Sequence, residues 1–454
     1  NNSNPVTVNL AAIGGENIEA VIGNTDSTII GTNTDNTWNI TADDGGTFNN
    51  TLNFSGFNTL SGGNANDTFQ LNNGVTFTGT IDGGAGTDTL DYSNNSNPVT
   101  VNLAAIGGEN IEAVIGNTDS TIIGTNTDNT WNITADDGGT FNNTLNFSGF
   151  NTLSGGNAND TFQLNNGVTF TGTIDGGGGD NTIIGSNTAN TWNLTNSDTG
   201  NINGSNFTAI NNLTGGSNND TFSFNDGVTF TGTIDGGAGT DTLDYSTYTS
   251  PLTVNLATLG GINIEQVTGT ANATSTLVAN NTANNWTITN SNSGTINGAL
   301  NFNTFSNLTG GSSNDTFELN DGVTFTGTVD GGAGTDTLDY STYTSPLTVN
   351  LATLGGINIE QVQGTINATS TLLANNTTNT WTITGNNNGT VNGLNFSDFS
   401  NLIGGTLDDR FQFNNPANIS SNIDGGAGNL TLSGDELNFT GTISGTGNLT
   451  LQPL

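Results

Sequence analysis

The chain contains no cysteine, methionine, histidine or lysine, and Arg410 is its one basic residue against 39 acidic residues. The missing cysteines exclude a disulfide framework and thiolate metal sites. A formal net charge of −38 without a basic cluster repels phosphate backbones and anionic lipid, so we expect neither nucleic-acid binding nor membrane insertion. No uninterrupted apolar run approaches the length of a membrane-spanning helix. The charged partners that remain plausible are cations.

Hydrophobic residues are also scarce, at 31% of the chain, while glycine is abundant with 66 residues. Such a composition leans towards disorder, but the patterning opposes it. Apolar and polar residues alternate with period two at 98–103, Thr68–Leu71, Val75–Thr78 and Trp38–Thr41, between Gly-Gly, Asn-Gly and Asp-Gly pairs. We find no helical periodicity. The sequence therefore predicts short strands separated by turns, and no helices.

Internal repetition is the strongest signal in the sequence. Residues Asn1–Gly84 recur unchanged as Asn94–Gly177, and five tryptophans recur at intervals of 93, 61, 94 and 95 residues. The short interval reflects a missing block of about 33 residues, which modules that touch only their neighbours tolerate. We expect one continuous solenoid over 1–454. Its repeat units are approximately 1–93, 94–179, 180–239, 240–334, 335–428 and a partial C-terminal unit 429–454.

The spacing of the turns indicates the size of one rung. Gly62-Gly63 and Gly83-Gly84 lie 21 residues apart, close to one coil of a β-helix. We therefore expect an all-β parallel β-helix (β-solenoid), an elongated repeat rod with roughly 19–21 residues per rung. The residues expected to face its core are Phe69, Leu71, Phe77, Ile81 and Leu90, with the copies Phe162, Leu164, Phe170 and Ile174.

One glycine-rich motif carries candidate chemistry. Ile81–Tyr92, Ile234–Tyr245 and Val329–Tyr340 contain Asp-Gly-Gly-Ala-Gly-Thr-Asp-Thr-Leu-Asp, and a looser version begins at Gly62, Gly155, Gly215 and Gly310. Both versions resemble the G-G-x-G-x-D nonapeptide of RTX calcium-binding β-rolls, in which oxygen ligands from neighbouring turns enclose Ca²⁺. The candidate Ca²⁺ ligands are Asp67, Asp88, Asp160, Asp220, Asp241, Asp315 and Asp336. The backbone of Gly62, Gly83, Gly215, Gly236, Gly310 and Gly331 completes the candidate sites.

A purely structural interpretation of this motif stays open beside the metal. Glycine can form the corner and aspartate can cap it through an Asx-turn. The motifs are not in tandem, since about 12 unrelated residues separate two copies, whereas true RTX arrays are continuous. Asn181 and Leu430 also replace the aspartate in two copies. The once-per-unit tryptophans have two interpretations as well, packing residues or an exposed carbohydrate platform.

Longer phrases resemble the repetitive regions of bacterial giant adhesins and filamentous-haemagglutinin-like exoproteins. These phrases are Leu213–Phe222, Thr233–Tyr245, Asn263–Val267 and Ser444–Leu454. The resemblance implies a right-handed parallel β-helix, export to the bacterial cell surface, and roles in adhesion, biofilm matrix or filaments. It supplies no catalytic residues.

We therefore expect an extracellular structural or adhesive repeat protein and not an enzyme, with Ca²⁺ as its one candidate cofactor. The expected partners are a second copy stacked end to end, or more of a longer chain, and cell-surface or matrix polysaccharide. An ice-binding or carbohydrate-binding solenoid is the alternative, and two outward ranks of threonine would favour ice binding. A β-helical polysaccharide-degrading enzyme is the weakest option, because its acids would need one unique site and these acids recur in every unit.

Overall fold

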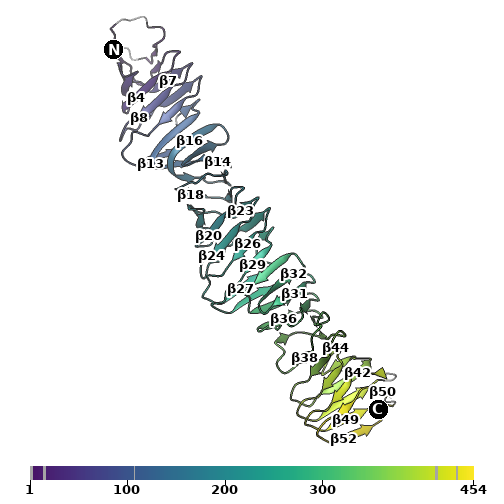
Figure 1. Cartoon of the computed structure of the whole chain (residues 1–454). Helices are drawn as coiled ribbons and strands as arrows, with labels where there is room; N and C mark the ends of the chain where they lie inside the picture. The colour runs from purple at the N-terminus through teal and green to yellow at the C-terminus, as the bar shows by residue number, and fades with distance from the viewer. Residues whose placement is uncertain (1–3, 14–16, 107, 415–417, 436–437, 454) are drawn as a thin grey trace. The chain divides into compact units, whose positions relative to one another are not determined.

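The computed structural model describes residues 4–13, 17–106, 108–414, 418–435 and 438–453. Over these residues the chain consists of strands and turns without a helix (Figure 1), and thus without a helix that could cross a membrane. The all-β solenoid fold expected from the sequence is confirmed. The chain divides into two compact units, of which the first comprises Asn1–Ser223 with Val228–Asp241 and the second Phe224–Gly227 with Thr242–Leu454.

Each simple rung contains two short strands joined by a Gly-Gly turn. Strand β7 (Thr59–Gly63) leads through this turn to β8 (Thr68–Leu71), and β9 (Thr80–Gly84) leads likewise to β10 (Thr89–Asp91). Strands β7 and β9 pair in parallel, as do β8 and β10. Each pair matches residues 21 positions apart, such as Thr59 and Thr80. Alternate side chains of β7 and β8 point inward, so the same register stacks apolar residues from rung to rung.

An antiparallel meander interrupts this regular winding in each repeat. Strands β4 (Thr37–Ala42), β5 (Gly45–Phe48) and β6 (Leu52–Ser55) pair antiparallel in chain order. Strand β4 then pairs in parallel with β8, which makes this rung 31 residues long. The prediction of a uniform 19–21-residue rung is wrong here, because alternation cannot distinguish a hairpin from a coil.

The same meander recurs along the chain. Its strands are β14 (Thr130–Ala135), β15 (Gly138–Phe141), β16 (Leu145–Ser154), β20 (Thr191–Leu194), β21 (Gly200–Ile202), β22 (Ser205–Thr208), β31 (Asn285–Asn290), β32 (Ser293–Ile296), β33 (Leu300–Asn303), β42 (Thr380–Gly385), β43 (Asn388–Val391) and β44 (Leu394–Ser397).

The core is filled by the residues that alternation predicted. Eight of the nine expected side chains are buried, while Phe77 is half-buried. Val75–Thr78, expected as a strand, is irregular, because it follows the turn closed by Val75 N–H on the carbonyl of Asn72. All five tryptophans are 0% exposed. Trp38, for example, lies nearly parallel to Phe69 with ring centroids 5.8 Å apart. The tryptophans are therefore packing residues and present no exposed carbohydrate platform.

Outward threonines form a single rank on the sheet that contains β7 and β9. Thr7, Thr28, Thr59 and Thr80 are matched across neighbouring strands. The next outward positions along the same strands hold Asn9, Ile30, Ser61 and Asp82. The positions that a second threonine rank would occupy on this sheet therefore hold mixed residues, which does not favour an ice-binding face.

Candidate functional site: a buried carboxylate ladder

The predicted aspartates occupy equivalent places in the rungs. Asp67 lies five residues after Gly62, at the end of the turn from β7 to β8. Asp88 has the same place between β9 and β10. All seven predicted aspartates are at most 1% exposed. These side chains therefore point into the stack and not into solvent.

Hydrogen bonds join these carboxylates from one rung to the next. Asp67 Oδ1 accepts the backbone N–H of Asn36 at 2.8 Å and its side-chain Nδ2 at 2.6 Å. The N–H of Asp67 donates in turn to Asp88 Oδ1 at 2.7 Å. Asp88 N–H donates to Glu112 Oε2 at 2.8 Å. Each carboxylate thus caps the equivalent backbone N–H of the preceding rung, a charge-assisted bond where the carboxylate is ionised. We call this arrangement the carboxylate ladder.

The ladder recurs in both units. Backbone N–H groups of Asn129, Asn190, Asn284 and Asn379 donate to the aspartate of the following rung at 2.6–3.0 Å. Their acceptors are Asp160, Asp220, Asp315 and Asp409. Asp220 and Asp315 donate to the next aspartates, Asp241 and Asp336, at 2.7 Å in both cases.

The glycine five residues before a ladder aspartate makes room for the carboxylate, as Gly62 does for Asp67. A Cβ on Gly62 would lie 2.3 Å from Asp67 Oδ2 and 2.3 Å from the carbonyl oxygen of Gly83. Gly62 is therefore required for space. Position 63 also needs glycine, because its φ is +130°, a backbone conformation that residues with a Cβ rarely adopt. The carbonyls of Gly62, Gly215 and Gly310 accept hydrogen bonds from ladder asparagines at 2.8–3.3 Å.

The second oxygen of the ladder carboxylates has a different environment. Oδ2 is buried without a hydrogen-bond partner among the described residues in Asp67, Asp88, Asp160, Asp220, Asp315, Asp336 and Asp409. Burial without compensation disfavours the charged form. It raises the pKa of Asp67 and of Asp220 to about 6, against the lowering effect of the Asn36 and Asn190 hydrogen bonds. Burial also raises the pKa of Asp88, Asp160, Asp315, Asp336 and Asp409.

The two sequence interpretations can now be compared with this geometry. The aspartates do cap backbone groups, but across rungs. The local Asx-turn is made instead by Asp82, whose Oδ1 accepts Gly84 N–H at 3.1 Å. For a cation, the ladder offers buried oxygens with raised pKa values. Over the described residues, however, no three acidic, histidine or cysteine side chains converge. A Ca²⁺ ion there would need backbone carbonyls or water for most of its six to eight ligands.

The two departures from the motif show what the ladder requires. At Asn181 the ladder persists, because Asp160 N–H donates to Asn181 Oδ1 at 2.9 Å. A neutral amide thus replaces the carboxylate. At Leu430 the side-chain ladder ends: Leu430 is buried, and Asp409 N–H donates to the backbone carbonyl of Asn429.

Sequence reasoning missed the residues at the ends of each ladder. These are Asn36, Asn129, Asn190, Asn284 and Asn379, together with Asp409, Glu112 and Glu360. A signal was present for the first asparagine. Asn36 follows Gly31 by five residues and precedes Trp38 by two, as Asp67 follows Gly62 and precedes Phe69.

Comparison with known proteins gives no family for this chain. No protein-family model matches the sequence, and no curated protein resembles it significantly.

Proposed function

We propose that this chain is an extracellular structural spacer, a stalk or matrix fibre that holds an adhesive or partner-binding region away from a surface. One observation supports the proposal most: in both units the recurring buried carboxylates of the carboxylate ladder form hydrogen bonds that join one rung to the next. An enzyme needs one unique arrangement of acids, whereas this arrangement recurs. Cell-surface or matrix polysaccharide is the proposed binding partner. We also propose that the solenoid stacks end to end on a second copy or belongs to a longer chain.

The repeats allow a direct test of the spacer. Residues 1–84 and 94–177 are identical, so deletion of residues 85–177 recreates the natural junction at residue 178. From β8 to its copy β17 (Thr161–Leu164), the sheet steps through β10, β13 (Ala113–Ile123), β16, β15 and β14. At ~4.8 Å a step, these six steps span about 29 Å.

The deletion should therefore shorten the particle by about 29 Å, which electron microscopy of the purified chain measures. The width should stay unchanged. A compact particle whose three dimensions all shrink slightly would contradict a spacer.

Ca²⁺ is the cofactor we propose for the ladder, since its buried oxygens fit a hard cation that lowers the cost of buried charge. At pH 8, 5 mM Ca²⁺ should raise the melting temperature of the full chain above its value in chelator. Equal Mg²⁺ should raise it less, because Mg²⁺ sheds its water reluctantly. An unchanged melting temperature in Ca²⁺ and in chelator would rule the cofactor out while leaving the spacer untouched.

A further inference from the structure

The stacking of strands is broken at a fixed point in the repeat. In the second unit, β36 (Thr328–Gly332) belongs to a sheet with the strand order β27-β30-β34-β36-β39. The next strand on this face, β38 (Leu347–Asn350), begins a separate sheet of order β38-β41-β45-β48-β51. The remaining strands of these two sheets are β27 (Leu252–Asn255), β30 (Ser275–Val278), β34 (Asn307–Gly311), β39 (Gly356–Ile357), β41 (Ser370–Leu373), β45 (Asn401–Ile403), β48 (Asn422–Asp424) and β51 (Ile443–Ser444).

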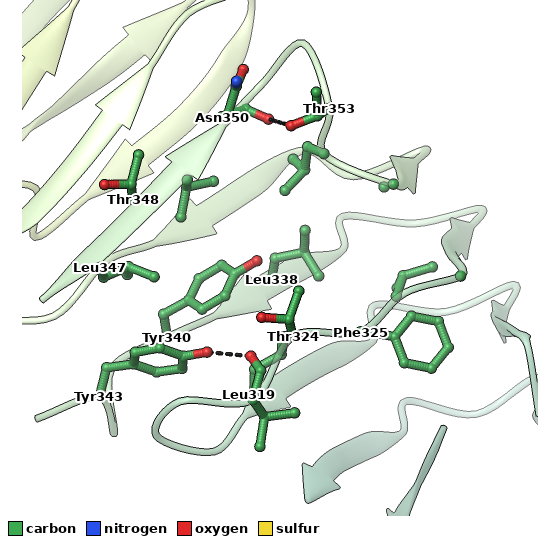
Figure 2. Close-up of a pocket in the computed structure, with 17 residues that line it drawn as sticks. Leu319, Thr324, Phe325, Leu338, Tyr340, Tyr343, Leu347, Thr348, Asn350 and Thr353 are labelled. Atoms are coloured by element: carbon green, nitrogen blue, oxygen red, sulfur yellow. Dashed lines mark hydrogen bonds between the residues drawn. The ribbon is translucent and has the colours of Figure 1, made fainter. Parts of the chain in front are cut away.

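A cavity of about 200 Å³ lies at this break. Its walls include the buried side chains of Val329, Leu338 and Val349 and the half-buried ring of Phe325 (Figure 2). The turn after β38 forms part of the lining and is held by Asn350, whose Oδ1 accepts Ala352 N–H at 2.9 Å. This turn therefore forms one fixed side of the cavity.

Two tyrosines line the cavity with different hydroxyl environments. Their rings meet edge to face with centroids 5.5 Å apart. Tyr343 donates its hydroxyl to the carbonyl of Val323. Tyr340 is 8% exposed, and its hydroxyl points into the space between the labelled side chains of Figure 2 without a hydrogen bond to any described residue. The hydroxyl oxygen keeps solvent-accessible surface and has no partner among the described residues, so this donor is available to a ligand in the cavity.

The same cavity occurs in the first unit. Phe77, Ile81, Leu90, Tyr92 and Val101 line a space of about 230 Å³ at the corresponding positions of the repeat. Tyr92 is the equivalent of Tyr340 there, whereas the position of Tyr343 holds Asn95. The cavity therefore recurs with the sequence repeat.

We propose that the cavity beside Tyr340 binds a small neutral molecule of one ring that carries a hydrogen-bond acceptor. The ring packs against Leu338, Val349 and Phe325, and the acceptor receives the Tyr340 hydroxyl. The volume sets the size, because an apolar cavity of about 150 Å³ already holds benzene. No charged side chain lines the cavity, which leaves an ionic ligand without compensation.

The chain's five tyrosines make this proposal directly measurable. The full chain is labelled with 3-fluorotyrosine, and the fluorine resonances are assigned by single Tyr→Phe variants. Acetophenone is the probe, and toluene is the matched ligand without an acceptor. We expect a saturable shift of the Tyr340 resonance, with acetophenone bound about tenfold more tightly than toluene, the value of one net hydrogen bond.

Two variants separate the hydroxyl from the ring. Tyr340→Phe should bind both probes equally, as followed at the Tyr343 resonance. Tyr343→Phe should keep the preference for acetophenone, because its hydroxyl already donates to Val323. The proposal is overturned if neither tyrosine resonance shows a saturable shift up to the solubility limit of the probe. It is overturned equally if Tyr340→Phe retains the preference for acetophenone.

Discussion

Replacing one ladder carboxylate by its amide should stabilise the rung at neutral pH. Asp220 is the best position, because its segment is unique in sequence, whereas residues 1–84 and 94–177 give identical peptides. Asn190 N–H donates to Asp220 Oδ1 at 2.6 Å, and an asparagine oxygen can accept the same bond. Asn181 provides the natural example, with its Oδ1 accepting the Asp160 N–H.

The magnitude follows from the pKa. Burial raises the pKa of Asp220 from 3.8 to about 6, so the folded state holds the proton more tightly than the unfolded state. Stability is therefore greatest in acid and falls as pH rises from about 4 through 6, by about 3 kcal/mol in all. At pH 8 the variant Asp220→Asn escapes this cost. Since solenoid rungs open locally, the gain corresponds to about 100-fold slower hydrogen exchange.

Peptide-resolved hydrogen exchange over residues 212–224 measures this effect in chelator. We expect slower exchange of Asp220→Asn than of the natural chain at pH 8, and nearly equal exchange at pH 4. The control is Asp180→Asn, because Asp180 is exposed and, among the described residues, its carboxylate accepts one hydrogen bond, from the Asn212 side chain at 2.9 Å. Equal exchange of Asp220→Asn and the natural chain at pH 8, or faster exchange of the variant, would refute the buried-charge argument.

Three further predictions concern space, packing and acid. Gly215→Ala should lower the free energy of unfolding by more than about 2 kcal/mol in urea unfolding, because its Cβ would lie 2.4 Å from Asp220 Oδ2. Gly204→Ala should lower it by only about 1 kcal/mol, because the added Cβ would have no neighbouring atom within 4 Å and only the positive φ opposes it. Equal losses in the two variants would contradict the steric role of Gly215. Trp192→Ala should cost about 3–5 kcal/mol by circular dichroism, since the ring is fully buried and stacks on Phe222; a loss below about 1 kcal/mol would show that it is not packed there. The full chain in chelator should melt at a higher temperature at pH 4.5 than at pH 8, and the reverse order would contradict the raised ladder pKa values.

The sequence was sufficient for the fold class and the core because both depend on local period and on repetition. Phe69 and Leu90 stack since they recur 21 residues apart in strands of the same pattern. The meander was not predictable in the same way. Strand β5 alternates poorly, and its antiparallel pairing with β4 and β6 depends on the turns at either end. The order and direction in which these strands pair could therefore be read only from the structure.

The candidate site was predicted in its positions but not in its environment. Spacing identified Asp67 and Asp88 as neighbours, and they are joined by one hydrogen bond. Spacing carries no information about burial, which depends on Gly62 leaving room for the carboxylate. The role of Asn36 was also hidden, because an asparagine among so many has no distinct signal until its spacing to Gly31 and Trp38 is compared with the aspartate motifs.

The ionisation of a ladder aspartate is the most direct test of the account. Carboxyl ¹³C resonances of the aspartate-labelled chain can be followed against pH in chelator, and Asp220→Asn identifies the Asp220 signal by its loss. We expect this carboxyl to titrate near pH 6. A pKa below about 4.5, the range of an ordinary solvated aspartate, would contradict a buried carboxylate ladder as the element that joins the rungs.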